Sequence, residues 1–384
     1  MGKFARCPRG VVWRRAGRAG LLLGGVLLAG ALFGACGTGT GPEPAPSPTP
    51  EMIETPTPPS TPPPSPTPTP NPYEGLEGIN PLTGLPMEAD YEDRRPAAVM
   101  LNNLKKALPM FGVSQADIIY EALAEGGITR MVGVFQNPSQ VPQIGTVRST
   151  RAYYLDIAQG HDAILLHAGG SPEAYTEIKR RGVAALDCLR GYEGSLYWRD
   201  KDRIKNAGLE HSAFTSGARI ESVFQTLKVR IRHEEGYREA LRFADDGTPA
   251  PGAPAVSISV RYSSYKTGLF TYDPETKRYA CTQYDAPYID GQDETQVSVV
   301  NVLVLRAAVS QVKGDSAGRL TTRLTGTGEG FFACGGRMTS IVWSKASHDA
   351  PFVYTLKDGG APLVLGRGQS YINIVSTKAS VEVS

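Results

Sequence analysis

The hydrophobic pattern changes its period once along the chain, near residues 244–254. Before that stretch, apolar runs of strand length alternate with segments of helical spacing, and 219–243 predicts one or two amphipathic helices. After it, short runs alternate between apolar and polar positions and are separated by Gly- and Asp-rich turns. The pattern predicts an α+β protein, with a mixed α/β domain at 73–245 and an antiparallel β-rich domain at 255–384. We expect the two domains to fold independently, because the stretch between them is rich in Pro, Gly and Asp.

A hairpin is predicted around Gly126-Gly127, since a glycine pair suits a two-residue turn. If these glycines form the turn, Leu123 faces Arg130, and Glu121, Glu125 and Arg130 share one face of the sheet. The opposite face is apolar enough to pack on a core. The charged face is open to two interpretations, a solvated surface or one wall of a site.

Two further arginines, Arg148 and Arg151, precede a short helix predicted to end at Gly160, with Ser149 or Thr150 as its N-cap. Arginines at a helix N-terminus oppose the helix dipole. A bound anion would explain them, and so would pairing with the hairpin carboxylates. The sequence leaves both an anion site and an internal salt-bridge network open.

A second anion-binding element is suggested by the segment His167-Ala168-Gly169-Gly170-Ser171-Pro172. It follows a buried strand and precedes a helix with Ser171 as N-cap, Pro172 at its first position and Gly182 at its end. Backbone N–H groups of Gly169, Gly170 and Ser171 can cradle an anion in this geometry. His167 is expected to face either the same crevice or the core.

The first 35 residues have the pattern of a lipoprotein signal peptide. Several arginines precede an apolar stretch from Leu21 to Phe33, which is too short to span a bilayer as a mature helix. The stretch ends in Gly34-Ala35-Cys36, which resembles a bacterial lipobox, so Cys36 is the predicted lipidation site. Residues 36–72 are rich in Pro and Thr and are expected to form an extended spacer between the lipid and the folded part.

Charge and cysteine usage narrow the function further. The signal peptide carries six of the 40 basic residues and none of the 38 acidic ones, so the mature chain has four more acidic than basic residues. That balance gives no electrostatic support for nucleic-acid binding. Cys188, Cys281 and Cys334 remain after Cys36; Cys281 and Cys334 are candidates for a disulfide, but spacing does not decide it. The chain has no CxxC or Cys/His cluster, so we expect no metal site and no cofactor.

Several motifs, taken in order, resemble those of the YerB-like bacterial lipoprotein family: NPLTGLP, ADIIYEALAEGGITR, GTVRSTRAYY, HAGGSPEA, VNVLVL and SIVWSK. The resemblance covers nearly everything from Asn80 to the C-terminus. It implies a lipoprotein on the outer face of the cytoplasmic membrane, with a mixed α/β part followed by a β part. It implies no particular reaction. The family often has a His-Asp pair where this chain has Tyr288-Ile289-Asp290, so any role of that histidine does not transfer.

Three functions compete. The first is a non-catalytic, membrane-anchored module that binds an anionic group of a cell-wall polymer or envelope protein through Arg130, Arg148 and Arg151, and it is the one we favour. The second is a hydrolase with Glu121 or Glu125 as general acid or base, assisted by His167 or His211. An adjacent Arg130 would keep both carboxylates ionised, which disfavours acid catalysis. The third is a scaffold that recruits envelope proteins through the β-rich domain.

Overall fold

The computed structural model describes residues 75–227 and 230–384, and its central element is one mixed sheet of 12 strands. The signal peptide, Cys36 and the 36–72 spacer lie outside the described residues. The strands of this sheet, in spatial order, are β12 (Ala253–Pro254), β21 (Arg337–Lys345), β20 (Gly326–Cys334), β18 (Asn301–Gln311), β24 (Ser370–Ser376), β4 (Ile118–Leu123), β5 (Thr129–Phe135), β3 (Ala97–Asn102), β7 (Ile164–His167) and β8 (Ala185–Asp187), with β19 (Leu320–Arg323) beside β18 and β22 (Val353–Leu356) beside β21.

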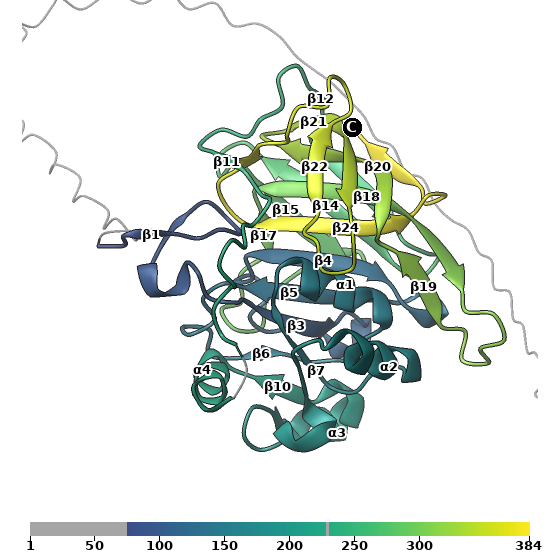
Figure 1. Cartoon of the computed structure of the whole chain (residues 1–384). Coiled ribbons are helices and arrows are strands. Elements are labelled where there is room, and N and C mark those ends of the chain that lie inside the picture. Colours follow the sequence, from purple (N-terminus) through teal and green to yellow (C-terminus); the bar gives the residue numbers. More distant parts are fainter. Residues whose placement is uncertain (1–74, 228–229) are drawn as a thin grey trace, which may run out of the picture. The chain divides into compact units, whose positions relative to one another are not determined.

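This sheet joins the two parts that the hydrophobic pattern separates. Strand β24 from the β-rich part pairs in parallel with β4 from the α/β part, in a register that sets Asn373 opposite Glu121. The two strands lie side by side in Figure 1. Because strand hydrogen bonds cross from one part to the other, the pairing argues against independent folding. It also corrects the expectation of a purely antiparallel second part, since β18 and β24 are parallel as well.

A second sheet of six strands covers part of one face of the large sheet. Its strands are β16 (Ala286–Pro287), β15 (Arg278–Gln283), β14 (Thr267–Asp273), β13 (Ser257–Arg261) and β25 (Val381–Val383), with β17 (Ser298–Val299) beside β15. Strands β14 and β15 form a hairpin that turns directly after Asp273. Three short sheets complete the fold: β1 (Gly78–Ile79) with β2 (Pro86–Met87), β6 (Ile144–Gly145) with β10 (Ala213–Thr215) and β9 (Trp198–Arg199), and β11 (Phe243–Ala244) with β23 (Leu365–Gly366).

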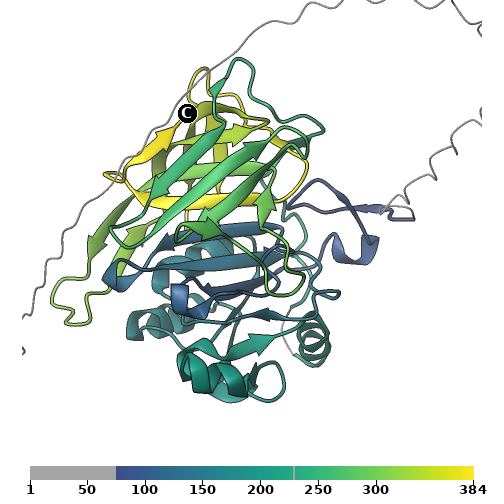
Figure 2. The ribbon, with the colours of Figure 1, turned by 180° about the vertical axis from the view of Figure 1, so that it is seen from behind.

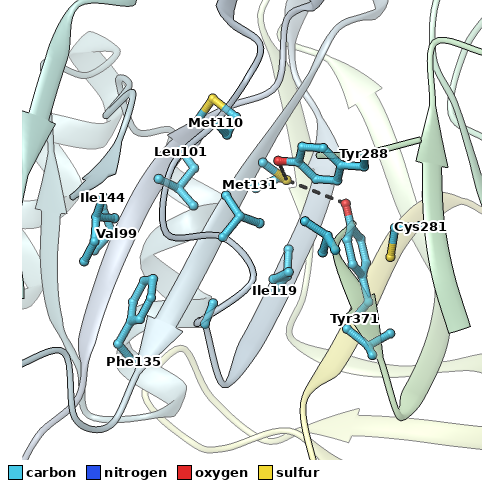
Figure 3. Close-up of a cluster of buried hydrophobic side chains, with 14 of the residues drawn as sticks. Val99, Leu101, Met110, Ile119, Met131, Phe135, Ile144, Cys281, Tyr288 and Tyr371 are labelled. Atoms are coloured by element: carbon cyan, nitrogen blue, oxygen red, sulfur yellow. Dashed lines mark hydrogen bonds between the residues drawn. The ribbon is translucent and has the colours of Figure 1, made fainter. Parts of the chain in front are cut away.

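The core between the two sheets draws side chains from both parts of the chain. Leu101 and Met131 of the α/β part are buried in the same cluster as Cys281 of the β-rich part. The hydroxyls of Tyr288 and Tyr371 both lie against the Met131 sulfur, at 3.8 and 3.6 Å (Figure 3). Cys281 and Cys334 are free cysteines on strands of different sheets, so they do not form the disulfide that the sequence left undecided.

The described residues contain four α-helices, which lie against the sheets in Figures 1 and 2: α1 (Ala152–Gly160), α2 (Pro172–Arg181), α3 (Lys201–Asn206) and α4 (Gly217–Thr226). Helix α1 packs on the face of β4 that carries Tyr120, and its Tyr154 hydroxyl donates to the Ala122 carbonyl at 3.0 Å. Helix α4 packs in the cluster on the opposite face. Helix α2 connects β7 to the parallel strand β8 in a βαβ unit.

The predicted limits of α2 are confirmed. The Ser171 hydroxyl accepts from the Ala174 N–H at 3.1 Å, and Gly182 ends the helix with φ 65°. Helix α1 ends at Gly160 as predicted, but its N-cap is Arg151 instead of Ser149 or Thr150. Of the one or two amphipathic helices predicted in 219–243, α4 is one, and the described residues after it form no second helix. There Arg232 lies in an antiparallel bridge with Arg94, which holds the chain extended.

The predicted register of the β4–β5 hairpin is also wrong. The turn is three residues, Glu125–Gly127, with φ 68° at Gly126 and 75° at Gly127, and Ala122 is opposite Arg130. A shift of one residue transfers a side chain to the other face of a strand. Arg130 therefore lies on the face of α1, whereas Glu121 lies on the face of the six-stranded sheet. The two side chains do not share a surface.

Glu121 is instead the centre of a buried polar network between the sheets, with 1% of its surface exposed. It accepts from Asn103 at 2.7 Å, from Thr129 at 2.6 Å and from Tyr371 at 2.5 Å. The ammonium group of Lys266, from the loop between β13 and β14, lies 3.5 Å away and is also 1% exposed. Burial lowers the pKa of Lys266, and the Glu121 carboxylate opposes that shift. The network thus connects the two parts of the chain by charge as well as by strand pairing.

We predict that Lys266→Met lowers the free energy of unfolding by about 3–5 kcal/mol, because it leaves Glu121 as an uncompensated buried charge. The double variant Glu121→Gln/Lys266→Met should recover a large part of this loss. Lys357→Met, which breaks the exposed pair between Lys357 and Glu329, should cost less than about 1 kcal/mol. Urea unfolding measures all three. Equal effects of the two lysine substitutions would show that the buried charge pair does not hold the parts together.

Candidate functional site

The strands β3, β4, β7 and β8 run in the same direction, so their carboxyl ends meet at one edge of the sheet. Helices α1 and α2 begin at this edge, and β5 starts there with Thr129-Arg130. In sheets of this kind, ligands bind in the crevice at the carboxyl ends of the strands. The hairpin turn at Glu125 and the loop after His167 also lie here. The edge therefore collects most of the residues that the sequence singles out.

The segment before α1 fills the gap where β3 and β7 end. The Arg148 N–H donates to the Met100 carbonyl of β3 at 2.8 Å, and the Arg148 carbonyl accepts from Ala168 N–H after β7 at 3.0 Å. Thr150 N–H donates to the Gly169 carbonyl at 2.9 Å. These bonds place the two predicted anion-binding segments against each other. The structure thus brings Arg148 and Arg151 next to Gly169 and Gly170.

Glu125 is held between two guanidinium groups. Arg130 Nη2 donates to Glu125 at 3.0 Å, Arg151 Nε donates at 3.1 Å, and Arg151 Nη2 forms a further close contact with the carboxylate. Although burial raises the pKa of Glu125, the hydrogen bonds and charges of Arg151 and Arg130 prevail and lower it to about 2. Glu125 is therefore ionised at neutral pH, and this part of the cluster is an internal salt-bridge network.

Arg148 is the guanidinium that this carboxylate does not reach. Within the part of the chain that the structure describes, Arg148 forms no ion pair, and its Nη1 donates to the Glu210 carbonyl at 3.2 Å. Burial and the positive charge of Arg130 lower the pKa of Arg148 to about 10, so the side chain stays charged at neutral pH. Glu125 thus pairs with two of the three guanidinium groups, and the Glu210 carboxylate acts on Arg148 by its charge from beyond ion-pair distance.

Arg130 itself has unused hydrogen-bonding capacity. Only 3% of the residue is exposed, and its Nε and Nη1 atoms are buried without a hydrogen-bond partner among the described residues. A buried donor left unpaired costs about 1–3 kcal/mol, more when it is charged. The arginine cluster therefore has more positive than negative charge, and two N–H donors of Arg130 lack acceptors there.

His211 joins the cluster from the short helical turn Leu209–His211. The Asn102 side chain lies 2.8 Å from His211 Nδ1, and because the amide nitrogen donates, Nδ1 is the acceptor and Nε2 carries the proton. Burial and the charge of Arg148 lower the pKa of His211, which keeps the ring neutral. Asn102 was not expected in the site. The signal for it was its position at the carboxyl end of a strand, next to Arg130 in the register.

The hydrogen bonds of His167 and of the loop at Gly169–Ser171 mainly hold the conformation of that loop. His167 is 1% exposed, its Nδ1 lies 2.9 Å from the Gly169 carbonyl, and burial lowers its pKa. The Gly169 N–H donates to Asp187 at 2.8 Å, and the Ser171 N–H donates to the Thr150 carbonyl at 3.3 Å. Two of the three N–H groups of the expected cradle are therefore engaged within the protein.

The two predicted carboxylates have separate surroundings. Glu121 lies in the buried network on the opposite face of the sheet, whereas Glu125 lies in the turn between Arg130 and Arg151. The loop of the β-rich part reaches the same turn, since Ser263 Oγ donates to the Gly127 carbonyl at 2.5 Å. Asp290 belongs to the Tyr288-Ile289-Asp290 segment, where this chain lacks the histidine of the family's His-Asp pair; it accepts from Gly112 and Ser114 N–H at 3.0 and 2.8 Å and holds that loop. Among residues 75–227 and 230–384, no group of three or more His, Cys, Asp or Glu side chains is placed to hold a metal ion.

Family models and a related protein both match this chain over most of its length. Residues 82–230 match the family model described as "Protein of unknown function (DUF3048) N-terminal domain", and residues 258–372 match its C-terminal domain. The chain is 32% identical over 311 residues to the Bacillus subtilis (strain 168) protein named "Putative lipoprotein YerB", covering 79% of this chain and 88% of that protein.

The fold agrees with a solved relative. The crystal structure of YerB from Bacillus subtilis superposes with a TM-score of 0.69 at 28% identity, covering 80% of this chain and 100% of that one. None of the helices in the described residues has the length and apolar character needed to cross a membrane. Both domains of the family are matched in order, and the YerB protein aligns with this chain over 88% of its own length. The chain therefore belongs to the DUF3048 family.

Proposed function

We propose that this protein is a lipid-anchored module of the bacterial cell envelope that binds an anionic group at the carboxyl edge of its large sheet, without catalysing a reaction. The observation that carries the proposal is the surplus of guanidinium groups: Glu125 pairs with Arg130 and Arg151, and Arg148 forms no ion pair in the described residues. The buried, unpartnered Nε and Nη1 of Arg130 support it. An anion bound there would supply the charge and the acceptors that the protein does not.

The ligand chemistry follows from the donors. Guanidinium groups bind carboxylates and phosphates with two parallel hydrogen bonds, and the protonated Nε2 of His211 adds a neutral donor. Ser149, whose Oγ accepts from Arg151 Nη1 at 3.2 Å, has its own hydroxyl proton to donate. A phosphate of a wall polymer, a peptide carboxylate or an acidic tail of an envelope protein all present this chemistry.

The anchor and location rest on sequence and family. The signal peptide, the lipobox at Cys36 and the Pro/Thr-rich 36–72 spacer are typical of a lipoprotein held on the outer face of the cytoplasmic membrane. A relative named as a lipoprotein supports the same class. In this arrangement the spacer presents the arginine cluster to wall material or to envelope proteins. The partners are therefore the membrane, through the lipid, and an anionic envelope molecule.

The geometry favours the hydrolase alternative less. Glu121 and Glu125 do not form a pair, and Glu125, with a pKa of about 2, has no proton to donate at neutral pH. His167 is buried and holds the loop carbonyl of Gly169. The scaffold alternative gives the arginine cluster no role. An anion that binds the wild type but not an arginine variant would therefore favour the proposal over the scaffold.

We predict that two arginine substitutions in the same cluster differ in their effect on stability. Arg151→Ala should lower the free energy of unfolding by roughly 1.5–3 kcal/mol, because it removes charge-assisted hydrogen bonds to Glu125. Arg148→Ala should leave stability within about 0.5 kcal/mol of the wild type or slightly higher, because it relieves repulsion from Arg130 and Arg151. Chemical denaturation of both variants is the measurement. If Arg148→Ala destabilises as much as Arg151→Ala, Arg148 belongs to the internal network and the proposal fails.

We also predict that inorganic phosphate stabilises the wild-type protein relative to chloride at equal ionic strength. A ligand that binds only the native state at about 100 times its Kd adds about 2.7 kcal/mol to the free energy of unfolding. Arg148→Ala should lose this gain, whereas Arg261→Ala, at an exposed arginine of β13, should keep it. Acetate titrations, run in parallel, compare carboxylate with phosphate. A wild-type protein that responds to neither anion contradicts the binding role.

Finally, Cys36→Ala should abolish lipid attachment. We expect the variant to be released into the medium or to remain as the uncleaved precursor, because the lipidated cysteine directs both cleavage and retention. Membrane fractionation and mass spectrometry of the N-terminus distinguish these outcomes. A variant that is still processed and retained like the wild type would exclude Cys36 as the anchor.

A further inference from the structure

A second candidate site lies at the opposite edge of the large sheet, away from the arginine cluster. A cavity of about 400 Å³ is lined there by Pro96, which precedes β3, and by His161, which follows α1 and precedes β7. Gln136, directly after β5, and the segment 233–239 complete much of its wall. This volume is within the range of small-ligand pockets. No step of the proposed anion binding uses it.

The lining of this cavity is strongly acidic. It contains five carboxylate residues and one arginine, Arg238; the acidic residues are Glu92, Asp93, Glu234, Glu235 and Glu239. Asp93 pairs with Arg232 and Glu234 with Arg230, and neither of these arginines belongs to the lining. Glu92 and Glu235 form no ion pair within the described part of the chain. The cavity therefore has negative charge that the protein does not neutralise.

Gln136 provides an independent indication of a ligand. It is 2% exposed, and its Nε2 donates to the carbonyls of Tyr91 and Arg94, both at 2.7 Å. Its Oε1 is buried and has no hydrogen-bond partner among the described residues. Because the amide nitrogen is fully engaged, Oε1 is the one polar side-chain atom of this cavity-lining residue that lacks a partner among the described residues. A buried acceptor without a partner costs about 1–3 kcal/mol, which a ligand N–H would recover.

Glu239 keeps an ionised carboxylate deep in the same cavity. His161 Nδ1 lies 2.7 Å from its Oε2, and His161 Nε2 lies 2.8 Å from the buried Tyr120 hydroxyl. Burial raises the pKa of Glu239, but His161, the Ala240 N–H and the Tyr237 hydroxyl lower it by more, so it ends below its ordinary value. The charge is thus fixed in place by a chain of hydrogen bonds that reaches into the sheet.

The other walls are apolar. Pro81, Leu82 and Pro96 contribute to them, and the Tyr237 ring stacks on His233 with centroids 4.0 Å apart and planes at 12°. A ligand with a charged end and a short carbon stem therefore matches both kinds of wall.

We propose that this cavity binds a primary ammonium group carried on a short organic stem. Carboxylates and the Gln136 carbonyl oxygen are acceptors for the three N–H donors of an ammonium, and the Pro, Leu and Tyr surfaces receive the stem. The acidic residues are not arranged as a metal site, since the described residues contain no group of three potential ligands. Amino sugars and lysine-like side chains both present this chemistry. The proposal is independent of anion binding by the arginine cluster.

Titration calorimetry on the full-length protein tests it with two matched pairs of probes. Glucosamine is compared with N-acetylglucosamine, and Nα-acetyl-lysine amide with its Nε-acetylated form. We expect at least one amine to bind and its acetylated partner to bind at least about tenfold more weakly, because acetylation removes one charge-assisted interaction. Binding of glucosamine alone identifies an amino sugar, and binding of the lysine probe alone identifies an amino acid side chain. Failure of both amines, or equal binding of amine and acetylated form, overturns the proposal.

Two variants locate the binding. Glu235→Gln removes an unpaired carboxylate of the lining and should weaken amine binding about tenfold. Glu239→Gln keeps the shape of the side chain and should weaken binding at least as much, although its buried position also makes it the variant more sensitive to folding. Glu275→Gln, in the turn after β14 and outside the cavity lining, should leave binding unchanged. Equal affinity of wild type and Glu235→Gln would place the amine elsewhere and refute the assignment.

Discussion

The rest of the structure depends on one constraint, the parallel pairing of β24 with β4. The buried contact of Lys266 with Glu121 reinforces this pairing. Strand β4 carries Glu121 toward the six-stranded sheet, where Tyr371 of β24 donates to the carboxylate at 2.5 Å. Removing either partner would leave a charge in a core that also contains the Met131 and Tyr288 contacts. The β-rich part of the chain therefore completes the sheet and the core of the α/β part. It also holds the hairpin turn in place, through the hydrogen bond from Ser263 to the Gly127 carbonyl.

That position determines the chemistry of the carboxyl edge. Because the turn places Glu125 between Arg130 and Arg151, one carboxylate neutralises two guanidinium groups only in part, and Arg148 remains in excess. Burial is the main cause of the lowered pKa of Arg148, and the positive charge of Arg130 adds to it. In Glu125 burial acts in the opposite direction, and Arg151 and Arg130 lower the pKa against it. The arginine cluster stores repulsion that an anion relieves. Under the proposed function, the internal network accounts for the pairing of Arg130 and Arg151 with Glu125, and the open site is the interpretation for Arg148.

The sequence predicted what local chemistry determines. Ser171 caps α2 at its start, Pro172 takes its first position, and Gly182 ends it with a left-handed φ, as the sequence predicts. The register of the first hairpin was missed because Gly126 and Gly127 both accept positive φ in a two-residue or a three-residue turn, and the difference reverses every face. The burial of Glu121 was missed because its partners are remote: 250 positions separate it from Tyr371. Asn102 and His211 meet across 109 positions, which no spacing rule connects.

The most direct test of the central claim, that Arg148 is kept free for an anion, is a crystal structure of this protein with tungstate, whose strong anomalous scattering locates the ion without ambiguity. The account predicts an anomalous peak within hydrogen-bond distance of the Arg148 guanidinium, with Glu125 still paired to Arg130 and Arg151. A structure in which tungstate binds only elsewhere, while Arg148 is paired with a carboxylate of the protein, would contradict it.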